Sequence, residues 1–206
     1  MSAFCYILDR IWPPLVGASI AVFLTQLFAK LRTPKLNIIL ESRQYIYCSD
    51  ERGTEACYSW RFLIKNKKSI DWLPLRETAT NCQAKIEVFR DKQEVFKMNG
   101  RWANSAQISH LAQQDIFLKI QFPDPISIRS GKDEPLDGIV QFPGENNAFG
   151  WNNEAYFYKW RTPAYKLEKG QYRVIVTVSP QNSHEKSEEF KLIISDNYDQ
   201  TDLTSK

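Results

Sequence analysis

Six residues combine aromatic surface with polar groups in a pattern that could bind a ligand. Five of them fall in the stretch 149-FGWNNEAYFYKWR-161, and the sixth stands upstream in GRWANS. Aromatic faces beside a few polar groups are typical of ligand pockets, and this set would suit a nucleotide, a sugar or a peptide end. The candidate ligand-binding residues are Trp102, Trp151, Asn153, Glu154, Trp160 and Arg161.

The same residues also fit a purely structural corner of a β-sandwich. A buried Trp carries one N–H group that needs a partner, and Asn or Glu beside it can accept that bond and cap a turn. Arg161 could stack on an aromatic ring or pair with Glu154. The sequence alone leaves the pocket and the corner open as alternatives.

Catalytic chemistry finds little support in the sequence. The motifs GxSxG, HExxH, GxGxxG and the P-loop do not occur. His110 and His184 fall in polar loop contexts, and the acidic residues are scattered rather than paired for acid–base work. We therefore predict that the chain is not an enzyme and needs no cofactor.

The cysteines bear on metals and on disulfides. Cys5, Cys48, Cys57 and Cys82 form no CxxC pair, and the two histidines do not complete a tetrahedral zinc set. No metal site is therefore predicted. Cys48 and Cys57 bracket a turn and could face each other across a hairpin, as a disulfide if they lie in an oxidising compartment. Cys82 is typical of a small buried hydrophobe.

The N-terminal region predicts a transmembrane helix. Residues 11–29 carry no charge over 19 positions, about the length that crosses a bilayer as a helix. Trp12 suits a membrane interface, and Pro13 and Pro14 suit a first helical turn. We expect a short tail over 1–10, a transmembrane helix over 11–30 and a basic linker over 31–35. A cleaved signal peptide and a buried core helix are the rival interpretations.

Charge asymmetry predicts the orientation of this helix. Lys30, Arg32, Lys35 and Arg43 follow the apolar run, whereas Arg10 alone precedes it. The positive-inside rule then places the C-terminal domain in the cytoplasm and the helix in the inner (plasma) membrane, as a single pass. In that compartment thiols stay reduced, so a Cys48–Cys57 disulfide is expected only if the orientation is reversed.

Small residues on the helix suggest self-association. Gly17 and Ala21 are four positions apart, a spacing that lets two helices approach closely in lipid. Thr25 and Gln26 could add hydrogen bonds between helices. A homo-oligomer through this face is therefore a possible assembly, although small residues are common in membrane helices.

The remainder of the chain predicts strands. Alternating or apolar runs bounded by turn residues are typical of an antiparallel sandwich. We expect a β-sandwich over 36–195, a loop over 123–135 and a flexible tail over 196–206. The expected strands are 36–42, 44–49, 57–66, 82–89, 93–98, 116–122, 138–142, 171–179 and 188–195.

Two local features refine this picture. In LEKGQYRVIVTV, Tyr172 stands at a strand start after Gly170, as in the tyrosine corner of immunoglobulin-like sandwiches. The fold class predicted is therefore mainly β, an immunoglobulin-like antiparallel sandwich after one transmembrane helix. Lys65, Lys67 and Lys68 cluster in a loop, which is either a solvated turn or a contact for anionic lipid heads.

Several motifs together resemble a known family. They are TATNCQAKIEV (78–88), GRWANS (100–105), FGWNNEAYF (149–157), Trp160-Arg161 with Pro163, LEKGQYRVIVTV (167–178) and EEFKLIISD (188–196). The chain resembles a family of bacterial and archaeal proteins that join an N-terminal membrane anchor to a β-sandwich. The resemblance covers nearly the whole chain and implies this architecture, with Trp102, Trp151, Asn153, Glu154 and Arg161 at the family's recurrent positions. It implies no activity.

The sequence leaves three functions open. The leading prediction is a membrane-anchored binding or sensing module, with a small-molecule or protein ligand. The second is an oligomerising membrane effector, for example in defence, whose helices cluster and perturb the bilayer. The third is an accessory subunit of a membrane complex. A net charge of +3 and a pI of about 8.6 are too mild to predict specific nucleic-acid binding.

Overall fold

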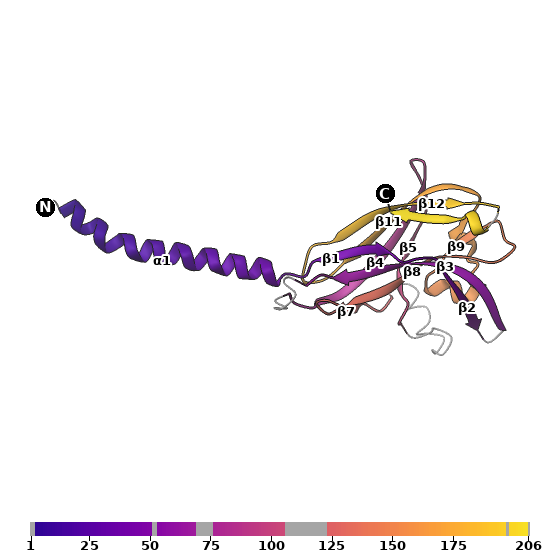
Figure 1. The fold of residues 1–206 in the computed structure, drawn as a ribbon, viewed down its shortest axis with the longest axis horizontal. Helices are drawn as coiled ribbons and strands as arrows, with labels where there is room; N and C mark the ends of the chain where they lie inside the picture. Colours follow the sequence, from indigo (N-terminus) through magenta and orange to yellow (C-terminus); the bar gives the residue numbers. More distant parts are fainter. Residues whose placement is uncertain (1–2, 51–52, 69–75, 106–122, 197, 206) are drawn as a thin grey trace.

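A long helix precedes two antiparallel sheets that pack face to face. The computed structural model describes residues 3–50, 53–68, 76–105, 123–196 and 198–205, without the side chains of 3–15, 49–50 and 198. Helix α1 (Ala3–Arg32) projects from one end of the sandwich, as Figure 1 shows. The coarse prediction of a mainly β sandwich after one helix is confirmed.

The first sheet carries the site described below. Its main path runs β1-β3-β8-β9-β10, with β2 paired to β3 and β6 paired to β8. The strands are β1 (Leu36–Leu40), β2 (Gln44–Asp50), β3 (Gly53–Asn66), β6 (Arg101–Trp102), β8 (Asp133–Gln141), β9 (Ala148–Gly150) and β10 (Lys166–Leu167).

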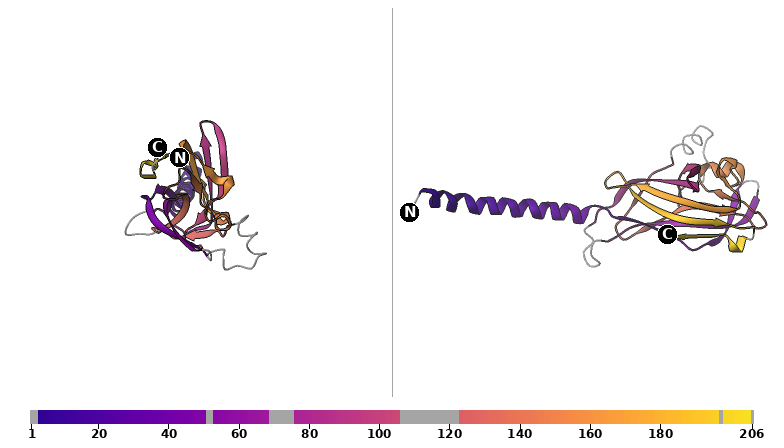
Figure 2. Two further views of the ribbon diagram at one scale, coloured as in Figure 1. Left: turned by 90° about the vertical axis from the view of Figure 1, so that its right-hand side faces the viewer. Right: turned by 90° about the horizontal axis from the view of Figure 1, so that it is seen from above.

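The second sheet covers the inner face of the first. It runs β13-β12-β11-β4-β5, with β7 paired to β4. The strands are β4 (Ala79–Arg90), β5 (Gln93–Asn99), β7 (Ile126–Ile128), β11 (Gly170–Ser179), β12 (Lys186–Ile194) and β13 (Asp202–Ser205). The two further views in Figure 2 show the strands of the sandwich running roughly along the axis of α1.

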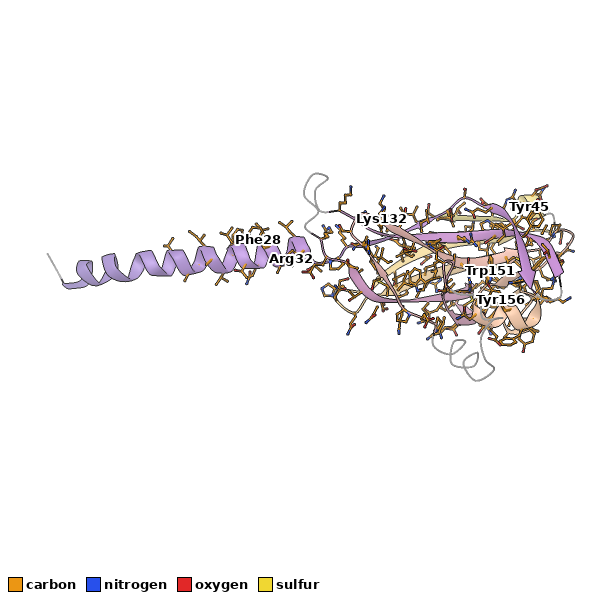
Figure 3. All side chains as sticks on the ribbon, turned by 90° about the horizontal axis from the view of Figure 1, so that it is seen from below. Phe28, Arg32, Tyr45, Lys132, Trp151 and Tyr156 are labelled. Carbon is orange, nitrogen blue, oxygen red and sulfur yellow. The ribbon has the colours of Figure 1, made fainter. Side chains whose placement is uncertain are left out.

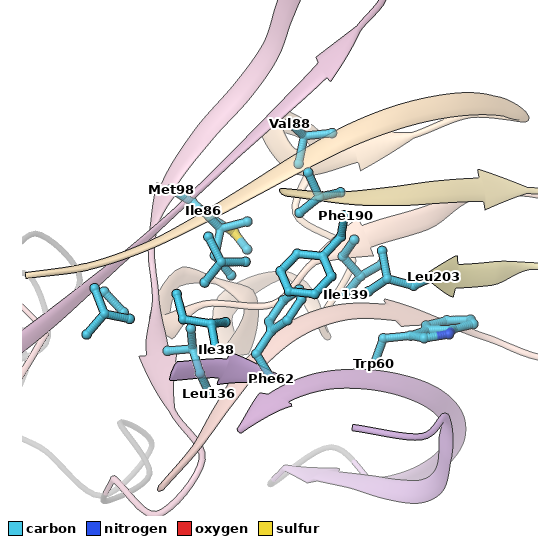
Figure 4. Close-up of a cluster of buried hydrophobic side chains, with 14 of the residues drawn as sticks. Ile38, Trp60, Phe62, Ile86, Val88, Met98, Leu136, Ile139, Phe190 and Leu203 are labelled. Atoms are coloured by element: carbon cyan, nitrogen blue, oxygen red, sulfur yellow. The ribbon is translucent and has the colours of Figure 1, made fainter. Parts of the chain in front are cut away.

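Alternation along the strands builds the main core between the sheets. Side chains of successive strand residues point to opposite faces, so the apolar members of each strand meet in the middle. Phe62 of β3 lies against Phe190 of β12, with ring centroids 4.9 Å apart, and Ile139 and Leu203 pack nearby (Figure 4). Burial of these side chains is the main stabilising term for the sandwich.

The tyrosine-corner hydrogen bond expected of Tyr172 is present. Its hydroxyl donates to the backbone carbonyl of Glu168 at 2.8 Å. Tyr172 is 5% exposed, so the ring packs in the core while its polar end finds a partner next to the turn. The bond fixes the entry of the chain into β11.

Helix α1 extends further toward the N-terminus than predicted. It begins at Ala3, so the expected tail over 1–10 is largely helical and Pro13 and Pro14 lie well inside the helix. An uncharged run indicates which residues a lipid bilayer would accept. It does not indicate at which residue the helix begins. Within the described residues, no helix is both long and apolar enough to cross a membrane. The predicted span over 11–29 is thus not confirmed. The structure does not describe the side chains of residues 11–15, the first five of this span.

The junction between α1 and the sandwich is held by polar contacts. The backbone N–H of Glu77 donates to the Arg32 carbonyl at 2.8 Å, and the side chains of the same two residues form an ion pair at 2.9 Å. Arg76 Nη1 donates to the Thr33 carbonyl at 2.8 Å. Arg43, one of the basic residues expected to flank the helix, lies instead beyond β1 over the Tyr58 ring.

Two expectations about loops are wrong. The segment 123–135 contains β7 and the start of β8, because Ile128 is buried against β4 although prolines surround it. The tail over 196–206 is not frayed, since β13 pairs with β12 and buries Leu203 to 2% exposure. One short helix, η4 (Tyr198–Gln200), turns the chain back for that pairing. The strand expected over 116–122 lies outside the described residues.

Candidate functional site

The aromatic residues that follow β9 fold onto the outer face of the first sheet. There they belong to a second, smaller hydrophobic core, which we call the outer cluster. Its buried members are Cys48, Cys57, Val140, Phe142, Phe149, Trp151, Ala155, Tyr156 and Trp160. The first sheet is therefore covered on both faces, by the second sheet on one side and by residues 151–160 on the other.

A short helix and an unusual turn shape this cover. In η2 (Asn153–Tyr158), the Asn152 side chain accepts the N–H of Glu154 at 3.0 Å and caps the first turn. Lys159 and Trp160 follow with φ of 49° and 61°, in the left-handed region. That conformation is rare for a bulky residue, and here the burial of the Trp160 indole at 3% exposure holds it in place.

Three strands bring two arginines to one buried carboxylate. In the sheet register Asp137 of β8 lies directly opposite Arg61 of β3 on one side and Arg101 of β6 on the other. Arg61 Nε donates to Asp137 Oδ1 at 2.8 Å, and Arg101 Nη1 donates to Asp137 Oδ2. The Asp137 side chain is fully buried. We call these three residues the Arg–Asp–Arg row.

Strand alternation explains why this row faces the outer cluster. Phe62 and Leu136 point into the main core, so their neighbours Arg61 and Asp137 point to the opposite face. A register shift between Trp60 and Arg61 bends β3 at this point. The position of the Arg–Asp–Arg row therefore follows from the same alternation of strand side chains that builds the main core.

Aromatic rings cover the two guanidinium groups. The Arg61 guanidinium lies 5.4 Å from the centroid of the Trp151 ring, and that of Arg101 lies 5.2 Å from the Tyr156 ring. Tyr156 in turn contacts Trp160 edge to face, with centroids 5.9 Å apart. Such cation–π pairs gain strength where water is excluded, which favours cations held at this position.

A cavity of about 270 Å³ opens between the row and the aromatic residues. We call it the Trp151 pocket. Figure 3 shows Trp151 and Tyr156 in the half of the sandwich that is farther from α1. The pocket is lined by Ile46, Tyr47, Cys48, Arg61, Arg101, Ala103, Ser105, Trp151, Tyr156 and Trp160.

Three buried N–H groups of the pocket's lining residues lack a partner among the described residues. They are Nε1 of Trp151, Nε1 of Trp160 and Nε of Arg101. Their side chains are 5%, 3% and 4% exposed, so bulk water does not compensate for the missing hydrogen bonds. Buried donors are nearly always paired in folded proteins, and all three of these need an acceptor.

The electrostatics of the pocket favour an anion. Burial raises the pKa of the Asp137 carboxyl above its ordinary value, against the opposing effect of Arg101 and Arg61. Whether Asp137 is ionised or protonated, the two guanidinium groups leave the Arg–Asp–Arg row with a net positive charge. Burial also raises the pKa of Tyr156, so this phenol stays neutral at physiological pH.

No protein-family model, curated protein or solved structure matches this chain. The family resemblance suggested by the sequence motifs remains a prediction. The interpretation of the site therefore depends on its own geometry.

The structure brings two of the six predicted ligand-binding residues to the pocket. Trp151 and Trp160 line it, whereas Asn153 and Glu154 lie in η2 without lining it. Glu154 contacts the Tyr165 hydroxyl instead and contributes to the raised pKa of that phenol, of which burial is the main cause. The prediction that Asn and Glu accept the indole N–H bonds is not confirmed for Trp151 and Trp160.

Trp102 and Arg161 lie elsewhere, for clear reasons. Trp102 follows Arg101 in β6, so it points to the opposite face and is buried in the main core at 2% exposure. Arg161 stacks 3.6 Å from the centroid of the Phe142 ring and pairs with Glu55 and Glu145 at 2.6 and 2.7 Å. The expected stacking on a ring is confirmed, and the expected pairing with Glu154 is replaced by these two acids.

Sequence reasoning missed Arg61, Arg101, Asp137 and Cys48 as members of the site. The sequence contained a hint for Arg101, because it stands next to Trp102 in GRWANS and strand alternation makes one of the two point outward. It contained a weaker hint for Asp137, an acidic residue immediately before the apolar run GIVQF. The meeting of these residues depends on strand pairing that no local pattern reveals.

The predicted helix-association residues lie on an open surface of α1. A Cβ added at Gly17 would meet nothing within 4 Å, and Ala21, Thr25 and Gln26 are exposed. The Thr25 hydroxyl donates to the Ala21 carbonyl one turn earlier at 2.8 Å. It is therefore engaged within its own helix rather than held ready to donate to a second one. His184 is exposed in its turn, and His110 lies outside the described residues.

Proposed function

We propose that this protein is a binding module whose Trp151 pocket holds a small ligand bearing a carboxylate or phosphate group. The observation that carries the proposal is the set of three unpartnered buried donors beside a net positive row. An oxyanion supplies several acceptor oxygens and a negative charge, which meets both requirements at once. The ring faces of Trp151, Tyr156 and Trp160 accommodate an apolar portion of the ligand.

This chemistry narrows the ligand classes considered from the sequence. A neutral sugar brings donors as well as acceptors and gains nothing from the positive charge. A complete nucleotide is large for a cavity of about 270 Å³, although its phosphate alone would fit. The carboxylate of a peptide end or of a small organic acid matches the size, the charge and the donors, and so ranks first.

Tryptophan fluorescence offers a direct test with two simple probes. The full-length chain in detergent is titrated with sodium sulfate and with sodium acetate, and sodium chloride at equal ionic strength is the blank. We expect a saturable change with one or both probes. Trp151→Phe keeps an aromatic ring but removes one donor, and should weaken binding about tenfold, the usual value of a hydrogen bond to a charged group. Trp160 remains as the reporter.

Two further variants separate binding from folding. Ala103→Leu adds bulk at the pocket wall without removing a core side chain, and should abolish the saturable signal. Arg161→Gln changes a guanidinium outside the pocket and should bind as the wild type does. The proposal fails if no probe saturates, or if Trp151→Phe and Ala103→Leu bind as tightly as the wild type while remaining folded.

Membrane attachment through α1 is the second element of the proposed function. The described side chains of α1 are apolar on several sides and exposed, including Ile20 at 54%, Phe23 at 64% and Phe28 at 53%. The helix projects away from the sandwich, which leaves these side chains uncovered (Figure 1). A lipid bilayer would cover them, and extraction of cell membranes at alkaline pH tests this: an attached chain stays in the pellet.

The end of the sandwich next to α1 is suited to face anionic lipid heads. Lys65, Lys67 and Lys68 surround an open hollow there, and Lys132 lies near the junction in Figure 3. With Lys30 and Lys35 close by, this basic end agrees with a domain on the cytoplasmic side of the membrane. Protease added outside intact cells should leave the domain uncut, and its digestion would refute this orientation.

Clustering of helices through Gly17 and Ala21 would support the alternative of a membrane effector. The open surface around Gly17 leaves room for a second helix. Gly17→Leu should then reduce chemical crosslinking between copies in the membrane. If crosslinking is unchanged, α1 acts as a simple tether or as the anchor of an accessory subunit.

The sandwich itself belongs, in this proposal, to the immunoglobulin-like type. The Tyr172–Glu168 hydrogen bond supports that assignment, because a tyrosine corner recurs in such domains. An experimental structure that allows the strand connections to be compared with those domains would test it.

A further inference from the structure

Two reduced cysteines form part of the wall of the Trp151 pocket. The Sγ atoms of Cys48 and Cys57 lie 2.7 Å apart, and both residues carry free thiols. A disulfide bond is about 2.05 Å long, so the two sulfur atoms are already within an ångström of bonding distance. Cys48 lines the pocket, whereas Cys57 is fully buried behind it.

The β2–β3 hairpin places these two side chains on one face. In its register Cys48 is paired with Glu55 and Cys57 with Ile46, which makes the cysteines diagonal neighbours. Ile46, Cys48 and Cys57 all pack in the outer cluster. Closure of a bond between the two sulfur atoms thus requires only a small shift of side chains and leaves the strand pairing intact.

We infer that Cys48 and Cys57 are a thiol-oxidation site, in which a small disulfide such as glutathione disulfide converts the pair reversibly to an intramolecular disulfide that fastens β2 beside the pocket. Cys48 Sγ, as a thiolate, attacks one sulfur of the small disulfide, whose S–S bond breaks and releases one thiol. Cys57 Sγ then attacks the Cys48 sulfur and releases the second thiol. Two protein thiols lose two electrons and two protons, and the small disulfide gains them.

Because the pair is buried, we expect its oxidation to be slow but not blocked. The hydrogen bond with Cys57 and burial both raise the pKa of the Cys48 thiol, so little thiolate is present at neutral pH. Oxidation should therefore accelerate as the pH rises. Cys82 has no second thiol beside it within the described part of the chain. It lies in the main core, its thiol donates to the Ala79 carbonyl, and burial raises its pKa to about 11.

The disulfide can be tested independently of any ligand. In a full-length chain with Cys5→Ser and Cys82→Ala, only the pair remains, and glutathione disulfide is added under native conditions. Mass spectrometry should find the loss of two hydrogen atoms and a cross-link between the peptides that carry Cys48 and Cys57. The oxidised protein should melt several degrees higher than the reduced one, as a cross-link constrains the unfolded chain. Cys57→Ser should give instead an unreacted chain or a mixed disulfide at Cys48.

The effect of oxidation on the pocket rests on the proposed function and is measured separately, as the sulfate affinity of the two redox forms. A change of about threefold or more is expected, since Cys48 lines the pocket. If the folded chain forms no cross-link while the urea-unfolded chain does, the inference is wrong even when sulfate binds. If the cross-link forms but neither form binds sulfate or acetate, the proposed function is wrong and the oxidation site stands.

Discussion

Arg61 Nε lies 2.8 Å from Asp137 Oδ1, and Arg101 donates to the other oxygen of the same carboxylate from the neighbouring strand. The carboxylate has no contact with solvent, so its only compensation in the described structure is these two guanidinium groups. This pairing fixes the position of both arginines beneath Trp151 and Tyr156. It is therefore the structural basis of the pocket.

Replacement of the Asp137 carboxyl by an amide should destabilise the fold. Asp137→Asn replaces one acceptor oxygen by an amino group that faces a guanidinium, and a buried hydrogen-bonding group left without a partner costs about 1–3 kcal/mol. Urea unfolding monitored by circular dichroism gives the free energy of unfolding. The exposed Asp133, at the start of the same strand, supplies the matched control Asp133→Asn, for which we expect a change within about 0.5 kcal/mol. Equal effects of the two variants would contradict this role of Asp137.

Anion binding should strengthen on acidification. The pKa of Asp137 is raised above its ordinary value of 3.8. As the pH falls through this raised pKa, the Arg–Asp–Arg row gains one positive charge while sulfate keeps its own charge. The sulfate affinity should therefore increase in the acidic range above pH 3.8, before an unperturbed Asp would titrate. The same raised pKa means that the contribution of Asp137 to folding stability is lost as the pH rises through it.

Arg161 should matter for stability and not for binding. It joins Glu55 and Glu145 across the rim of the outer cluster and stacks on Phe142. Because the pairs are partly exposed, Arg161→Gln should lower the free energy of unfolding by only about 1–2 kcal/mol. If Arg161→Gln loses sulfate binding but keeps the wild-type stability, Arg161 contacts the ligand, as the sequence predicted.

The C-terminal strand should be required for full stability. Leu203 is 2% exposed and belongs to the main core, although the sequence predicted a flexible tail. Leu203→Ala should cost about 2–5 kcal/mol by leaving a cavity. Asp202→Ala, an exposed neighbour in the same strand, is the control and should change stability little. Protection of the β13 amides from hydrogen exchange would agree with this result.

The sequence predicted the long strands well because each has enough residues for a period to appear. Trp60, Phe62 and Ile64 form one apolar face over several positions, opposite a face of mixed polarity, and β3 contains them all. By contrast β6, β9 and β10 have two or three residues each, which is too short for any period to stand out. The C-terminal strand was missed because only Leu203 in DLTS is apolar.

The candidate site was only half predictable for a related reason. Trp151 and Trp160 are close in sequence and share one local fold, so composition alone brought them together. Arg61 and Asp137 are 76 residues apart, and Arg101 and Asp137 are 36 apart. Their meeting is decided by which strand pairs with which, and by the register of that pairing. Successive residues of β6 point to opposite faces of the sheet, so Arg101 lines the pocket and Trp102 does not. Which of the two faces the pocket can be decided only once the sheet is known.

The indole N–H resonances of Trp151 and Trp160 provide the most direct test of the pocket. In a ¹⁵N–¹H correlation spectrum of the labelled chain, the six tryptophans give separate indole signals, which Trp→Phe variants assign. Addition of sulfate or acetate should shift the signals of Trp151 and Trp160 saturably, while those of Trp60 and Trp102 in the main core stay in place. If the Trp151 and Trp160 signals do not move, or if all the signals move together, the pocket does not bind anions through these donors.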